Sequence, residues 1–216
     1  MIKGIIFDFD GTLVDSMPIW KNLGSRYLIS KGLEPQLDLE SVLNRMSINE
    51  CSEFLIKEYQ LNMTPLEVTN EINEYISNDY EKLKLKTNVL EVLNYYKSKD
   101  IKMAIATAND LINVEKFIIS NNLLSYFEFI ITCPELETSK KSVLIFEEAT
   151  KRLNLNKEEV IFVEDALHPI EVLINNGFKV YAVYDENEKD NINKIKSIAT
   201  KYYRKFDDWH HDILNI

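Results

Sequence analysis

Carboxylates gather in one short segment near the N-terminus. The stretch FDFDGTLVDS, residues 7–16, follows the apolar run Ile2 to Phe7 and places Asp8 and Asp10 two residues apart. Residues at i and i+2 of an extended segment point to the same side, so both carboxylates can face one ligand. Two like charges this close raise each other's pKa unless a cation or a shared proton relieves them. The segment therefore predicts a site that holds a cation or handles protons.

Other polar side chains follow further apolar runs along the chain. Thr107 and Asn109 follow the second run, Glu164 and Asp165 follow the fourth, and Lys140 lies beyond the third. In parallel α/β sheets, ligands bind in the crevice at the carboxyl ends of the strands. Carboxylates that meet there, together with water and a substrate phosphate, are the ligands that Mg²⁺ prefers. We therefore expect a Mg²⁺ site at this edge.

These residue types can transfer a phosphoryl group. A carboxylate beside Mg²⁺ can attack phosphorus and form an aspartyl-phosphate. A second carboxyl group can protonate the leaving oxygen and then activate water, and Asp8 and Asp10 fit these two roles. Gly11 can turn sharply and leave backbone N–H groups open to phosphate oxygens, while Thr107 and Lys140 can neutralise charge on the transferring group.

The apolar runs predict the strands of a buried parallel sheet, because they are short, rich in β-branched residues and separated by helical patterns. The intervening segments have the i, i+3, i+4 apolar spacing of amphipathic helices, and Gly177 suits a helix end. The fold class is therefore α/β. The predicted strands are Ile2–Phe7, Ile101–Ala106, Phe129–Thr132, Val160–Val163 and Lys179–Val183, and the predicted helices lie in 88–99, 113–124, 142–155 and 168–177.

A helical insert interrupts this alternation. Residues 17–82 contain helical stretches at 41–61 and from Pro65 onward, and no convincing strand. Thr64, Pro65 and Glu67 form a helix start, with Thr64 at the N-cap, proline in the first turn and glutamate three residues after the cap. The predicted domains are therefore a core made of residues 1–16 and 83–216 and a helical domain made of residues 17–82.

Composition limits the function classes. The 216 residues include 45% hydrophobic and 28% charged side chains, which is typical of a folded globular protein. A net charge of −10 argues against a general partner of nucleic acids or anionic membranes. The sequence has no apolar run of about 20 residues and no signal peptide, so we expect a cytoplasmic protein with reduced cysteines. The basic stretch KYYRKF at 201–206 is expected to be a solvated helix end or loop, and WHH at 209–211 an exposed tail.

Four ordered motifs together resemble the haloacid dehalogenase (HAD) superfamily. They are DFDGTLVDS, AIATAND, SKKSVLIFEEA and VIFVEDALHPIEVLINNG, and each stands at a predicted strand end. The similarity covers nearly the whole chain and is greatest to the branch with β-phosphoglucomutase and small sugar-phosphate phosphatases. It implies a Rossmann-like parallel sheet core flanked by helices, with an inserted all-helical cap. It also implies a phosphatase that uses Mg²⁺ and an aspartyl-phosphate.

The resemblance assigns roles by position. Asp8 would be the nucleophile, and Asp10 the general acid and base whose backbone carbonyl also binds Mg²⁺. Thr107 would bind phosphate, and Lys140 would neutralise charge, with Lys141 as the alternative because the proline usual after this lysine is missing. The implied metal ligands are Asp8, Asp10, Glu164 and Asp165, and the implied phosphate or substrate contacts are Gly11, Thr12, Ala108, Asn109 and Arg45.

Departures from the family pattern narrow the function. Trp20 stands where mutase-type members usually have a histidine, and tryptophan cannot exchange protons at neutral pH, which disfavours phosphomutase chemistry. Arg45 replaces a common glycine and could reach a substrate anion or be an ordinary surface residue. EDALHP replaces the usual EDSxxG, and His168 could touch the leaving group or be a solvated residue near a helix start.

The sequence favours a phosphatase acting on a small phosphorylated metabolite, most simply a sugar phosphate. Two alternatives remain: a β-phosphoglucomutase-like phosphomutase, and a non-catalytic regulator that binds a phosphorylated ligand. The expected partner is the small metabolite, without nucleic acid or membrane, and the expected state is a monomer or weak dimer.

Overall fold

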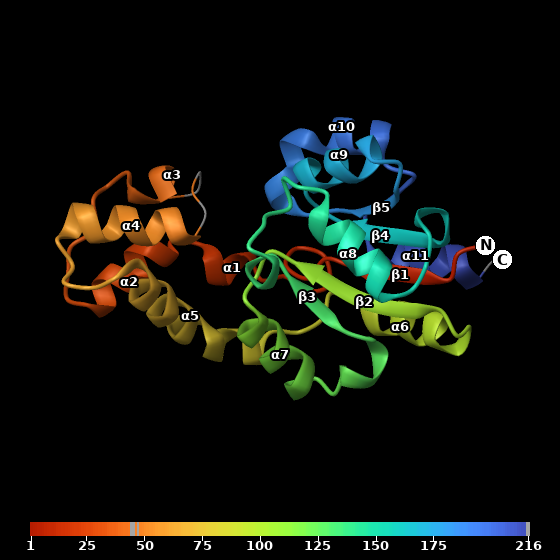
Figure 1. The fold of residues 1–216 in the computed structure, drawn as a ribbon, viewed down its shortest axis with the longest axis horizontal. Coiled ribbons are helices and arrows are strands. Elements are labelled where there is room, and N and C mark those ends of the chain that lie inside the picture. Colours follow the sequence, from red (N-terminus) through yellow and green to blue (C-terminus); the bar gives the residue numbers. More distant parts are fainter. Residues whose placement is uncertain (44–45, 47, 215–216) are drawn as a thin grey trace. The chain divides into compact units, whose positions relative to one another are not determined.

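The computed structural model describes residues 1–43, 46 and 48–214 (Figure 1). The chain divides into two compact units. Unit 1 comprises Met1–Ser16 and Leu83–Ile216, and unit 2 comprises Met17–Lys82. The chain therefore leaves unit 1 soon after its first strand and returns to it before its second.

A six-stranded parallel sheet forms the centre of unit 1, with the order β3-β2-β1-β4-β5-β6. Short apolar segments form these strands, and the first strand is buried along its whole length. The first strand lies between β2 and β4, which is where a doubly wound sheet places its ligand site. The strands are β1 Gly4–Phe7, β2 Lys102–Thr107, β3 Ile130–Thr132, β4 Val160–Glu164, β5 Lys179–Val183 and β6 Lys201–Tyr203.

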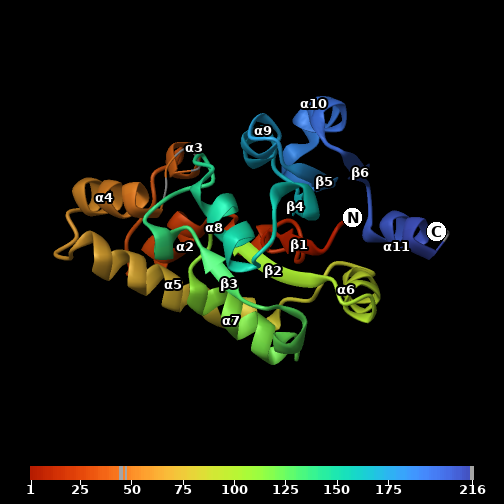
Figure 2. The ribbon, with the colours of Figure 1, turned by 45° about the vertical axis from the view of Figure 1, so that its right-hand side comes forward.

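Amphipathic helices cover both faces of this sheet (Figures 1 and 2). On one face, α8, α9 and α10 pack on alternate strand residues such as Ile6, Ala104 and Phe162 to form one apolar core. The opposite face carries α6 and α7. Phe117 of α7 packs edge-on against Phe9, with 5.3 Å between the ring centroids. These helices are α6 Val89–Ser98, α7 Leu111–Ser120, α8 Leu144–Arg152, α9 Leu167–Asn175 and α10 Ile192–Ile198, and short 3-10 helices span Leu124–Tyr126, Pro134–Leu136, Lys157–Glu159 and Glu186–Asn191.

The α/β prediction and its five strands are confirmed, with boundaries within two residues. The C-terminal expectations were wrong. The KYYRKF stretch begins with β6, and WHH lies in α11, Phe206–Leu214. Trp209 is fully buried, stacks on Tyr203 at 5.4 Å and donates a hydrogen bond to the Tyr96 hydroxyl at 3.0 Å. The charged residues between these aromatic residues made the segment look solvent-exposed, although it forms a short strand and a helix that packs within unit 1.

Trp209→Ala should therefore lower the free energy of unfolding by about 3–5 kcal/mol, the usual cost of truncating a buried tryptophan. The loss has two parts, the cavity among the aromatic rings and the unpaired Tyr96 hydroxyl. Urea denaturation followed by circular dichroism measures it. Ile119→Ala is the matched control because Ile119 is 57% exposed. Equal effects of the two substitutions would contradict the anchoring role of Trp209.

In the described part of unit 2, all regular secondary structure is helical. The helix start at Thr64 is confirmed: its backbone N–H donates to Glu67 Oε2 at 2.7 Å, and the Glu67 N–H donates to Thr64 Oγ1 at 3.3 Å. Of the helical stretch expected at 41–61, the described residues contain the end of α3 and all of α4, and residues 44, 45 and 47 lie outside the described part. The bounds are α1 Met17–Trp20, α2 Leu23–Ser30, α3 Leu39–Leu43, α4 Ile48–Tyr59 and α5 Pro65–Lys82.

Both cysteines are free thiols, Cys51 in unit 2 and Cys133 in unit 1. None of the described helices combines the length and the apolar character needed to cross a membrane.

Candidate active site

The sheet register brings the first and fourth motifs together. Asp8 directly follows β1, and Glu164 is the last residue of β4. Phe7 pairs with Val163, and the Asp8 N–H donates to the Val163 carbonyl at 2.9 Å. Asp8 therefore lies level with Glu164 at the carboxyl edge of the sheet.

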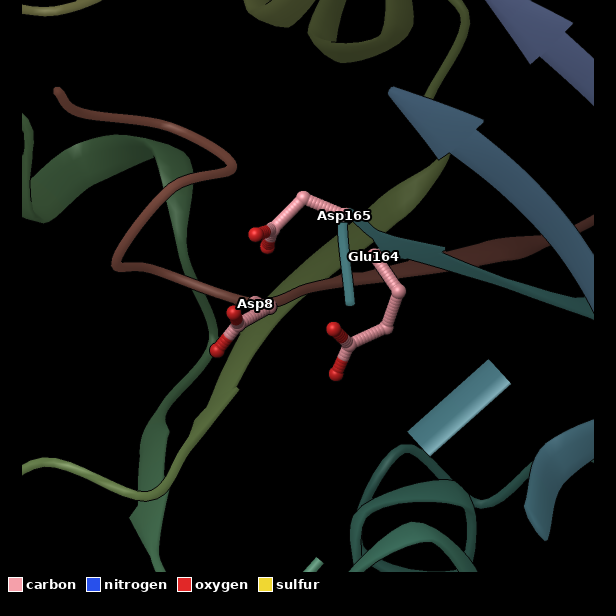
Figure 3. Close-up of side chains that lie close together, drawn as sticks. All are labelled: Asp8, Glu164 and Asp165. Atoms are coloured by element: carbon pink, nitrogen blue, oxygen red, sulfur yellow. The ribbon is translucent and has the colours of Figure 1, made fainter. Parts of the chain in front are cut away.

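Three carboxylates meet at this edge. Asp8, Glu164 and Asp165 each offer an oxygen within 4.8 Å of the others, and Figure 3 shows their side chains turned toward one another. Their exposed fractions are only 9%, 2% and 8%. Buried carboxylates this close need a counter-charge, because burial and mutual repulsion both oppose ionisation.

Lys140 supplies part of that charge. Its ammonium pairs with Asp8 Oδ1 and with Glu164 Oε1, the latter at 2.6 Å. Burial alone would lower the pKa of Lys140, but the charges of Asp8 and Glu164 raise it well above its usual value, so the side chain stays cationic. Lys141 is exposed. Of the two candidate lysines, the structure places Lys140 in the acidic cluster.

One ammonium does not balance three carboxylates. Burial, followed by the charge of Asp8, raises the pKa of Glu164 well above its usual value, and the same two causes raise the pKa of Asp165 to about 8. Glu164 Oε2 is buried and has no hydrogen-bond partner among the described residues. An orphaned carboxylate oxygen beside two more carboxylates fits a hard divalent cation such as Mg²⁺. The donor set therefore suits the predicted metal.

Asp10 lies outside this cluster and has a separate partner. Its Oδ2 accepts a hydrogen bond from Asn109 Nδ2 at 2.7 Å. The Asn109 backbone N–H donates to Thr107 Oγ1 at 3.1 Å, and its side-chain oxygen accepts from Asn113 Nδ2 at 3.0 Å. Asn113 is a buried residue of α7 that the sequence analysis missed; its position four residues after Asn109 is the signal that could have found it.

The turn after β1 packs closely on the acidic cluster. Gly11 has φ +77°, and a Cβ there would lie 2.5 Å from Asp165 Oδ2. Only glycine fits, because other residues rarely adopt this left-handed backbone conformation and their Cβ would clash with the carboxylate. The Thr12 hydroxyl donates to Asp165 Oδ1 at 2.8 Å and so holds that carboxylate in place, while the phosphate contact expected of Thr12 stays a prediction.

The remaining residues that the sequence singled out are outside the acidic cluster or outside the described residues. Ala108 is exposed between Thr107 and Asn109 at the same sheet edge. Arg45 lies outside the described residues. His168 is exposed near the start of α9, as the solvated alternative expected. In unit 2, Trp20 packs edge-on against Tyr80 at 6.4 Å between ring centroids.

A doubly wound α/β sheet with clustered carboxylates at the carboxyl ends of its strands is typical of one class of enzymes. The family model described as haloacid dehalogenase-like hydrolase matches residues 5–183. The chain belongs to this family, as the four motifs predicted.

Two curated relatives are phosphatases. A phosphorylated carbohydrates phosphatase from Thermotoga maritima is 25% identical over 184 residues, which cover 84% of this chain and 85% of the relative. A glyceraldehyde 3-phosphate phosphatase from Methanocaldococcus jannaschii is 26% identical over 177 residues, which cover 76% and 77%.

Solved structures share the fold. A HAD hydrolase of family IA from Entamoeba histolytica superposes with a TM-score of 0.80 at 21% identity, over 96% of this chain and 95% of that one. The β-phosphoglucomutase from Clostridium difficile superposes with a TM-score of 0.75 at 18% identity, over the full length of both chains. These similarities establish the Rossmann-like architecture.

Proposed function

We propose that the chain is a phosphatase that hydrolyses a small phosphorylated carbohydrate through an aspartyl-phosphate at Asp8. The observation that carries this proposal is the buried cluster in which Asp8 faces Glu164, Asp165 and the ammonium of Lys140. The names of the curated relatives support the substrate class, since two of them act on phosphorylated carbohydrates or glyceraldehyde 3-phosphate.

In the first half-reaction, a carboxylate oxygen of Asp8 attacks phosphorus while the bond from phosphorus to the ester oxygen breaks. Asp10 enters this step as the carboxylic acid and gives its proton to the departing oxygen, so the product leaves as an alcohol. The hydrogen bond from Asn109 fixes the Asp10 carboxyl group, and the orientation of an acid controls its efficiency.

In the second half-reaction, Asp10 is the carboxylate that takes a proton from water. The resulting hydroxide attacks phosphorus, the bond to Asp8 breaks, and inorganic phosphate leaves. Lys140 stays cationic and offsets negative charge throughout. Asp8, Glu164 and Asp165 would hold Mg²⁺, with the Asp10 carbonyl as a further ligand, and this ion would stabilise the charge that builds on the phosphoryl oxygens.

Unit 2 is proposed to be the cap that selects the substrate, with Arg45 as its candidate contact to a substrate anion. Closure of such a unit would exclude water during the first half-reaction. A phosphomutase is the second candidate, because β-phosphoglucomutase shares the fold. Trp20 disfavours it, since an indole offers no acceptor or transferable proton at neutral pH.

Phosphate release tests the proposal. Purified protein with Mg²⁺ is assayed against sugar phosphates, triose phosphates, nucleotides and p-nitrophenyl phosphate, with Asp10→Asn as the acid–base control. We expect turnover of a sugar or triose phosphate that Asp10→Asn lowers by about 100-fold to 10,000-fold, the range for general acid–base groups. Interconversion of β-glucose 1-phosphate and glucose 6-phosphate without phosphate release would favour the mutase. Ligand binding with no turnover at all would favour a regulator.

A further inference from the structure

A half-buried lysine outside the four motifs contacts the turn that follows β1. Lys86 Nζ donates a hydrogen bond to the Gly11 carbonyl, and it also lies 3.3 Å from the Tyr184 carbonyl and 3.3 Å from Asp185 Oδ2. The side chain of Lys86 is 19% exposed and that of Asp185 only 6%. All three N–H groups of this ammonium therefore have acceptors, which fixes it in one place.

The Gly11 carbonyl belongs to the peptide group that carries the Thr12 N–H. The neighbouring donors are used inside the turn: Gly11 donates to the Val14 carbonyl, and Leu13 and Val14 donate to the Phe9 carbonyl. The Thr12 N–H has no acceptor among the described residues. A cation on the carbonyl side of a peptide group polarises it and strengthens its N–H as a donor. The Thr12 N–H thus has no acceptor inside the turn and can donate to an anion.

Lys86 reaches Gly11 from a segment that is itself fixed to the turn. Leu85 forms an antiparallel bridge with Val14, and the Lys86 backbone N–H donates to the Leu13 carbonyl at 2.9 Å. On its other side, Asp185 is held by the Asn187 backbone N–H, which donates to its Oδ1 at 3.0 Å. The ammonium therefore joins the turn after β1 to the loop after β5.

We propose that Lys86 is a positioning residue of the phosphoryl-transfer site, which orients and polarises the Gly11–Thr12 peptide so that the Thr12 N–H can donate to a phosphoryl oxygen. This inference rests on the proposed phosphatase function. Negative charge on the phosphoryl group is redistributed as the reaction proceeds, so a preorganised donor acts more on the transition state than on the bound substrate. Loss of Lys86 should lower kcat more than it raises KM.

Lys86→Met tests this. We expect kcat to fall by about 10-fold to 100-fold, the range found when a residue that orients a metal ligand is lost. The inhibition constant of orthovanadate should rise by a similar factor. Lys84→Met is the matched control, because Lys84 is an exposed lysine of the same segment. Lys86→Arg keeps the charge and should recover part of the loss. A purely structural role would reduce the amount of active protein and leave the orthovanadate constant of the folded molecules unchanged, which would overturn the inference.

A second variant guards against misfolding of Lys86→Met. Asp185→Asn keeps the acceptor for Asn187 and removes the charge that faces Lys86, so it should weaken orthovanadate binding in the same direction and by a smaller factor. Unchanged binding by Asp185→Asn and Lys86→Met alike would reject the role. Calorimetric titration with orthovanadate needs no turnover. A wild type that binds orthovanadate but turns over nothing would reject the phosphatase proposal, and the Lys86 comparison would still be decided.

Discussion

Asp8→Asn should abolish phosphate release, with a loss of about four orders of magnitude or more, the scale that follows removal of a nucleophile. The amide nitrogen of asparagine cannot attack phosphorus as a carboxylate does, while the side chain keeps almost the same shape. The change also removes one of three clustered charges. Because the charge of Asp8 raises the pKa of both Glu164 and Asp165, its removal should leave the protein as stable as the wild type or more stable.

This combination separates a chemical effect from a folding effect. Thermal unfolding and phosphate release are measured on the same preparations, with Asp15→Asn as the control because Asp15 is exposed in the same segment. Acid-quenched wild-type protein incubated with ³²P-labelled substrate should carry label that hydroxylamine removes, and Asp8→Asn should carry none. Substantial turnover by Asp8→Asn, or label retained in it, would place the nucleophile elsewhere.

Much of unit 1 was predictable because two signals coincide in the sequence, the apolar runs of the strands and the polar residues at their ends. The strands that lead to Asp8, Thr107 and Glu164 are apolar runs, and each run ends at polar residues that a hydrophobic core does not need. The parallel register then brings those ends together without any further information. The acidic cluster follows from the order of the motifs along the chain.

The sequence could not show contacts that depend on three-dimensional placement. Lys86 is one of three lysines in the stretch 82–86, and only the return of the chain beside Leu13 brings its ammonium to the Gly11 carbonyl. The hydrogen bond from the Thr12 hydroxyl to Asp165 likewise joins residues that are far apart in the sequence. Phe206, Trp209 and Ile213 have the i, i+3, i+7 spacing of a buried helix face, but the charged residues and histidines around them made the segment look like an exposed tail.

The second large effect concerns the divalent cation. Removal of metal with EDTA should abolish turnover, and Mg²⁺ should restore it and raise the melting temperature. At a Mg²⁺ concentration 100-fold above its Kd, binding stabilises the folded state by about 2.7 kcal/mol. A chain of this size shifts by about 2–4 °C per kcal/mol, so we expect a rise of about 5–10 °C. Calcium, which is larger and tolerates irregular coordination, should stabilise the protein without equal activity.

The pH dependence of that rise has a definite sign. Without metal, burial and the Asp8 charge raise the pKa of Asp165 from 3.8 to about 8, so between these values the folded state holds a proton that the unfolded chain releases. The metal-free protein therefore loses stability as pH rises through this window. Metal binding needs the ionised carboxylate, and protons compete with it at low pH. The Mg²⁺-induced rise in melting temperature should thus be larger at pH 8 than at pH 6.

Asp165→Asn tests whether this cluster is the binding site. The substitution keeps an acceptor for the Thr12 hydroxyl and removes the charge, so the Mg²⁺-induced rise should disappear and turnover should fall by at least about 100-fold, the upper end of the loss seen for groups that only support a metal ligand. Asp190→Asn, at an exposed acid of the same unit, should leave both unchanged. A rise in melting temperature that survives Asp165→Asn would mean that Mg²⁺ binds elsewhere. A rise that is lost without loss of turnover would mean that the ion at this cluster supports the fold and takes no part in the reaction.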